Sequence, residues 1–75
     1  MDAASERAVR VARALSDPRR FALLLRIAAE GEICCRDLTT LFPVSQATIS
    51  HHLKVLTDAG LVEARQEGQF HYYRS

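Results

Sequence analysis

Apolar residues recur at helical spacing over most of this chain and change to a strand-like pattern near its end. The spacing of Ala4, Ala8, Val11 and Leu15 predicts a first helix over about residues 2–15 with a single apolar stripe. We expect this stripe to be buried. The arginines that follow another side of the same helix are interpreted as a solvated face.

A second helix is predicted from the segment "SDPRRF" to about residue 29. Ser16 or Asp17 can cap its start, Pro18 fits the first turn, and Gly31 suits the left-handed position after its end. We expect the helix to be central and packed on two sides. Its apolar residues form one stripe of Phe21, Leu24, Leu25 and Ala28 and a second of Leu23 and Ile27.

The segment "CRDLTTLF" predicts a short third helix that Pro43 stops, with Leu38, Leu41 and Phe42 facing inward. After the tight turn "PVS", Ser45 is a good cap for a fourth helix that extends to residue 59. Two helices joined by a tight turn predict a helix-turn-helix over residues 35–59.

From residue 61 onward the pattern changes to that of strands. Residues 61–66 and 70–74 are rich in strand formers, and the segment "EGQ" between them supplies a glycine for a tight hairpin. Tyr72 and Tyr73 alternate sides, so one of them should face inward. The predicted fold is therefore mainly α with a small hairpin: one winged helix-turn-helix domain over residues 1–75, with a wing at 61–74 and room for an extra strand at Glu32–Cys34.

The composition of the chain excludes several classes of protein. The chain has 75 residues, 48% hydrophobic and 25% charged, which is ordinary for a globular domain. No apolar run approaches the length of a membrane helix and the start lacks a secretion signal, so we expect a cytoplasmic protein without a membrane partner. No catalytic triad, phosphate loop or carboxylate pair stands out, so we expect no enzyme. Because the net charge is only +1, positive charge for binding nucleic acid has to be concentrated locally or doubled in a dimer.

The fourth helix has the features of a DNA-reading element. At about 100° per residue, Ile49, Leu53 and Leu56 cluster on one face, which we expect to pack inward. The opposite face is small and polar, as base reading in the major groove requires. It carries Ala47, Ser50, His51 and Lys54, with Gln46 and Thr48 at its flanks.

The stretches "ALSDPRR", "EICCRDL", "VSQATISHHLKVLTDAGLV" and "EGQFHYYR" together resemble the ArsR/SmtB family of bacterial winged-helix repressors over about residues 12–75. The resemblance implies a homodimer that binds an inverted-repeat operator in double-stranded DNA and leaves it when an inducer binds. It also implies that Gln46, Ala47, Ser50 and His51 face bases and that Ser45, Thr48 and Lys54 lie near the DNA backbone. In the wing, Arg65, Gln69, His71 and Arg74 are candidates for phosphate or minor-groove contact.

Two further expectations concern packing. We expect the alanine-rich first helix, residues 1–15, to build much of the dimer interface, because small side chains permit close approach. The C-terminal helix that many members carry does not follow within this sequence. We expect His52, which turns away from His51, to make a hydrogen bond inside the protein.

Cys34 and Cys35 are the only cysteines. Many metal-sensing members carry a Cys-x-Cys at this place; here Cys34 falls on the first thiol position, and Arg36 replaces the second. Three interpretations stay open: small residues in a core, a site for arsenite or a soft metal ion completed from outside the chain, and a redox-sensitive pair. Two alternatives to an inducible repressor also stay open: a winged-helix protein-interaction module, and a constitutive repressor that senses no ligand.

Overall fold

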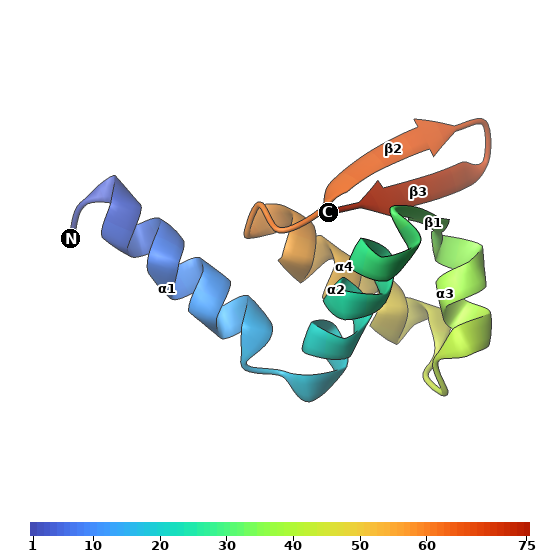
Figure 1. Cartoon of the computed structure of the whole chain (residues 1–75), viewed down its shortest axis with the longest axis horizontal. Coiled ribbons are helices and arrows are strands. Elements are labelled where there is room, and N and C mark those ends of the chain that lie inside the picture. Colours follow the sequence, from blue (N-terminus) through green and yellow to red (C-terminus); the bar gives the residue numbers. More distant parts are fainter.

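The computed structural model describes residues 1–75 and has four helices and three strands (Figure 1). None of the helices has the length and apolar character needed to cross a membrane. The expected winged helix-turn-helix is confirmed, including the short strand before the third helix. The elements are α1 (Ala3–Leu15), α2 (Pro18–Glu30), β1 (Glu32–Cys34), α3 (Cys35–Leu41), α4 (Gln46–Asp58), β2 (Glu63–Glu67) and β3 (Phe70–Arg74).

Three of the helices begin at a side chain that accepts backbone N–H groups. Asp2 accepts from Ser5, and Asp17 accepts from the two residues that follow Pro18. The Ser45 hydroxyl accepts from the Thr48 N–H at 3.2 Å. These bonds satisfy donors that the first helical turn leaves free. The helix boundaries therefore lie within one or two residues of those expected.

The hairpin and β1 form one antiparallel sheet in the order β1-β3-β2. One face lies against the helices: Ile33 is buried and Tyr73 packs against the core. Because side chains alternate along a strand, Tyr72 and its register partner Arg65 lie on the opposite, outer face. Tyr73 is thus the inward tyrosine of the pair.

The core lies between α2, α4 and the inner face of the sheet. Leu23 and Ile27 of α2 are fully buried, and so are the three apolar residues expected to face inward on α4. The prediction for α3 is partly wrong: Leu38 is fully buried, but Leu41 is 46% exposed. Leu41 is the last residue of this helix.

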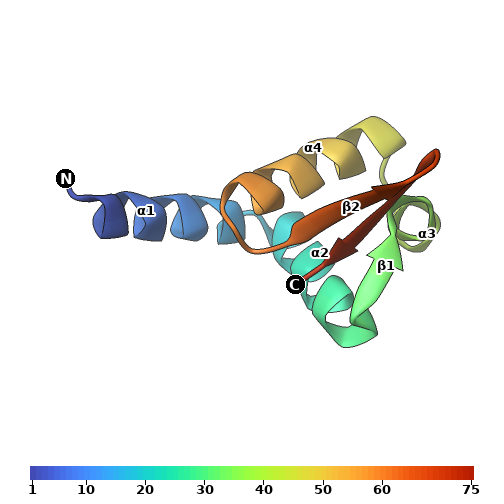
Figure 2. The same cartoon turned by 90° about the horizontal axis from the view of Figure 1, so that it is seen from above.

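The expectation that α2 packs on two sides is also wrong within one chain. Phe21 is 44% and Leu25 55% exposed, because no other element of the chain covers that side of the helix. Likewise, the apolar stripe of α1 is covered only in part: Ala4 and Ala8 are exposed, and Val11 and Leu15 are half-buried. Ala14 is the one buried residue of this helix. Figure 2 shows α1 extending away from the rest of the molecule.

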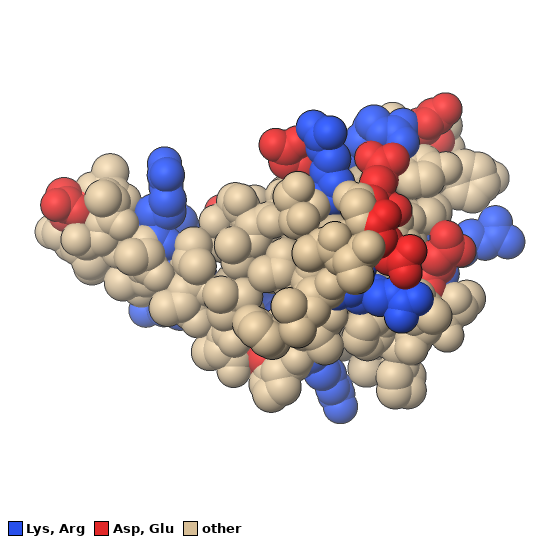
Figure 3. Space-filling view, viewed as in Figure 1, with Lys and Arg blue, Asp and Glu red and all other residues tan.

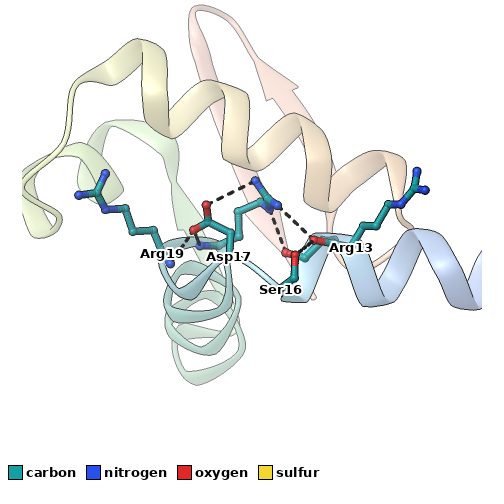
Figure 4. Close-up of polar contacts among 6 residues, drawn as sticks. Arg13, Ser16, Asp17 and Arg19 are labelled. Atoms are coloured by element: carbon teal, nitrogen blue, oxygen red, sulfur yellow. Dashed lines mark hydrogen bonds and ion pairs between the residues drawn. The ribbon is translucent and has the colours of Figure 1, made fainter.

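Arg20 at the start of α2 links this helix to the end of α1. Figure 4 shows the polar contacts around Arg13 and Asp17 at this junction. The Arg20 guanidinium donates to the carbonyl oxygens of Ala14 at 2.9 Å and Arg13 at 3.1 Å, which are among the last carbonyls of α1. It also pairs with the Asp17 carboxylate at 3.8 Å. One partly buried side chain thus ties the end of one helix to the cap of the next.

Candidate nucleic-acid interface

The side of α4 opposite the core is open to solvent. Ile49, Leu53 and Leu56 are 0% exposed and hold the helix against α2 and α3. We call the other side the outward face of α4. It consists of Gln46, Ala47, Ser50, His51 and Lys54, all exposed, with Thr48 half-buried beside them.

Local bonds organise both ends of this face. At its start, the Ser45 hydroxyl donates to the Thr48 Oγ1 atom at 2.9 Å while it caps the helix. Near its end, the Lys54 ammonium pairs with Asp58 at 3.2 Å, and both side chains are well exposed. Such an exposed pair contributes little to stability, so Lys54 remains available to an anion.

The two adjacent histidines of α4 have different environments. His51 is exposed on the outward face, whereas His52 is 6% exposed and packs toward the start of α2. Neither ring nitrogen of His52 has a hydrogen-bond partner, so the expected internal hydrogen bond is absent. Burial lowers the pKa of His52, the Asp17 carboxylate opposes that shift, and the Arg20 charge adds to it.

In the wing, Arg65 is bound within the protein. Its guanidinium contacts Glu32 at 2.8 Å and Glu67 at 2.6 Å and lies 4.5 Å from the centre of the Tyr72 ring. These hydrogen bonds raise the pKa of Arg65 and lower that of Glu32. Figure 3 shows acidic and basic side chains interspersed in this part of the molecule. The structure therefore places Arg65 on the outer face of the sheet together with Arg74, which pairs with Glu63 at 2.9 Å. Gln69 and His71 lie elsewhere, beside α4.

A cleft of about 600 Å³ separates the outward face of α4 from the wing. We call it the wing cleft. Residues 34–36 and Thr39 line one side, Gln46 and Ser50 line the second, and residues 69–71 and Tyr73 line the third. The structure thus brings Gln69 and His71 together with the start of α4, as a shared DNA surface requires. Arg36 also lines this cleft, a position that the sequence pattern did not indicate, since there Arg36 only replaces a thiol.

Cys34 and Cys35 are half-buried free thiols that line the wing cleft. Burial raises the pKa of the Cys35 thiol, the neighbouring Cys34 adds to the rise, and a hydrogen bond with Ser50 opposes it. No group of three or more His, Cys, Asp or Glu residues is placed to hold a metal ion. Soft ions favour several thiolates, so the residues of one chain do not complete such a site.

Comparison with known proteins agrees with this architecture. Residues 17–64 match the family described as "Bacterial regulatory protein, arsR family". The chain is 38% identical over 61 residues to the arsenical resistance operon repressor of Bacillus subtilis. That alignment covers 81% of this chain and 58% of the relative, so the chain spans little more than half of that protein.

Two solved structures are similar to the whole fold. The homodimeric winged helix-turn-helix DNA-binding domain of a possible ArsR-family regulator from Mycobacterium bovis has a TM-score of 0.88 and 38% identity, over 96% of this chain and 66% of that one. An ArsR-like regulator from Rhodococcus has a TM-score of 0.87 and 31% identity, over 99% and 69%. These matches are to regulators and not to enzymes, as expected from the sequence. The chain belongs to the ArsR family of bacterial regulatory proteins.

Proposed function

We propose that this chain binds operator DNA in a sequence-specific manner and represses transcription. The observation that carries the proposal is the outward face of α4, which is exposed, polar and flanked by the wing at its N-terminal end. Side chains near the start of such a helix reach base edges when it enters the major groove. Binding to DNA would place the protein in the cytoplasm.

We propose different roles for the residues at this surface. Gln46, Ala47, Ser50 and His51 would face bases, while Ser45, Thr48 and Lys54 would lie near the backbone. Gln69 and His71 of the wing share the wing cleft with α4, which supports contact on that side. For Arg65 we propose a supporting role within the wing, since its guanidinium is already bound to Glu32 and Glu67.

We further propose that the partner in solution is a second copy of the chain, bound through α1 and the exposed side of α2. Ala4, Ala8, Phe21 and Leu25 are all exposed. Much of the surface over α1 and α2 in Figure 3 carries no charged group. The similar structure from Mycobacterium bovis is described as homodimeric. A dimer would present two copies of α4 to successive major grooves, about 34 Å apart.

The test is selection from a pool of random-sequence duplex DNA. We expect enrichment of an imperfect inverted repeat, and we expect binding that weakens as salt rises, because phosphate contacts release counterions. A pool that remains random after selection would contradict sequence-specific repression. Binding that is insensitive to salt would favour a protein-interaction module, although the outward face of α4 carries no large apolar residue of the kind such a module uses.

A second candidate function is sensing by Cys34 and Cys35, which lie in the wing cleft beside residues of α4. The arsenical repressor among the relatives supports a thiol-directed inducer. Arsenite or a soft metal ion would need a further thiol from outside the chain. The test is release of DNA by arsenite, cadmium or peroxide. Release that persists unchanged in the double variant Cys34→Ser, Cys35→Ser would leave a repressor that senses nothing through these thiols.

A further inference from the structure

We propose that the wing cleft is a binding site for one sugar–phosphate strand of DNA and that Arg36 is its cationic residue. The inference rests on the proposed function, because it assumes that α4 enters the major groove. It adds a contact on α3, the first helix of the helix-turn-helix, which the family resemblance did not supply.

The position of the cleft follows from the shape of the duplex. A phosphate strand borders each side of the major groove, and a helix in the groove has such a strand beside it. The wing cleft lies beside α4, and its lining includes Gln46 and Ser50 of that helix and Gln69 and His71 of the wing. A strand that borders the groove on this side would lie along the cleft.

The charge of the cleft suits an anion. Its lining residues include Arg36 and no carboxylate, whereas the outer face of the sheet mixes both signs. Five of the ten basic residues of the chain form ion pairs, among them Arg26, Lys54 and Arg65. Arg36 forms none, and it is the only lysine or arginine that faces the cleft.

Hydrogen-bond donors in the cleft are also free. The guanidinium of Arg36 and the side-chain amides of Gln46 and Gln69 make no hydrogen bond within the chain, although the structure gives such bonds to Gln66, Arg65 and Arg74 near by. Arg36 is exposed, so it loses no internal contact when it binds. A guanidinium with several free N–H groups matches the geometry of a phosphate.

The test measures binding of fluorescently labelled random-sequence duplex DNA between about 50 and 200 mM salt. Phosphate contact does not depend on sequence, so an operator is not required. Arg36→Gln should weaken binding about tenfold, as expected for loss of a charged hydrogen bond. The slope of log affinity against log salt should fall in magnitude by about 0.9 for each chain.

Two variants control for net charge and for the chemistry of the side chain. Arg26→Gln removes the same charge on α2, where Arg26 pairs with Glu30 at 2.9 Å, and should leave the slope near that of the wild type. Arg36→Lys keeps the charge and should preserve the slope. An Arg36→Gln slope equal to that of the wild type would overturn the inference.

A footprint at the thiols gives a second readout. Cys34 and Cys35 line the same cleft, so bound DNA should slow their alkylation by N-ethylmaleimide, and high salt should restore the rate. Unchanged alkylation in saturated complexes would also overturn the inference. A different result would refute the proposed function: if the wild-type protein shows no salt-dependent binding to any duplex, it does not bind DNA.

Discussion

His52 is the only buried polar side chain of the core, and its ring has no partner for either nitrogen. It packs toward the start of α2, near the charged side chains of Asp17, Arg19 and Arg20, and His51 is its neighbour on α4. Three of these four groups disfavour a charged imidazole, and only Asp17 favours one. Burial and the two arginines therefore keep His52 neutral where a free histidine would take up a proton.

This environment predicts an acid-sensitive stability. The folded-state pKa of His52 lies below its ordinary value of 6.5, so the unfolded chain binds the proton more readily. The free energy of unfolding should be unaffected by His52 above that value and should fall as the pH drops below it. The lowered pKa of Asp17 acts in the same direction, but only below about its ordinary value of 3.8.

Urea unfolding between about pH 7 and pH 5 isolates the histidine. His52→Leu should remove most of the loss of stability over this interval, because leucine fills a buried site without a titrating group. An equal loss in the variant and the wild type would show that another group is responsible.

Arg65 shows why a residue's role is hard to predict from local sequence. It was a candidate for DNA contact because it is a cation in a wing. The register of β3 with both β1 and β2 brings it to Glu32, a residue far away in the chain, and to the ring of Tyr72. No local pattern reports that pairing. For the same reason Arg36 was missed, since its cleft exists only after the wing folds back beside α3.

At the scale of elements, the chemistry of single residues was sufficient to predict where the helices begin and end. Asp17, Pro18 and Ser45 are strong start signals, and Gly31 and Gly60 follow helix ends with φ near 80°. The backbone at these positions depends on the residue itself, so the boundaries could be predicted. The sides of α2 and α3 that other elements cover could not be predicted in this way, because they depend on how the elements pack. Phe21 and Leu41, for example, are apolar yet exposed.

The link between α1 and α2 provides a prediction at this scale. Arg20→Ala removes two hydrogen bonds to the end of α1 and the ion pair to Asp17. Arg20 is only 16% exposed, so we expect a loss of about 1–3 kcal/mol in the free energy of unfolding. Arg26→Ala, which breaks an exposed pair on the same helix, should cost less than about 1 kcal/mol. Equal costs would show that Arg20 does not fix α1.

At the scale of the whole molecule, the exposed apolar surface of α1 and α2 requires an explanation beyond one chain. A helix whose apolar stripe has no partner is stable in water only marginally by itself, and most helical stability comes from packing. A second copy would cover the stripe, the side of α2 that carries Phe21 and Leu25, or both.

Sedimentation of a variant that introduces a charge on α1 tests this interface. Ala8 is exposed on α1 and far from the core, so Ala8→Glu should leave the fold intact and convert a dimer into a monomer. Asp37→Arg, an exposed change on α3, should leave the dimer unaffected. A dimer that survives Ala8→Glu would place the interface elsewhere.

The central claim is that the outward face of α4 reads bases, and His51 tests it most directly. The measurement compares affinities for a duplex enriched by selection and for its scrambled sequence, at one salt concentration, in wild type and His51→Ala. We expect the variant to lose about 1–3 kcal/mol on the enriched duplex and almost nothing on the scrambled one. Equal losses on both duplexes, or no loss on either, would contradict the claim.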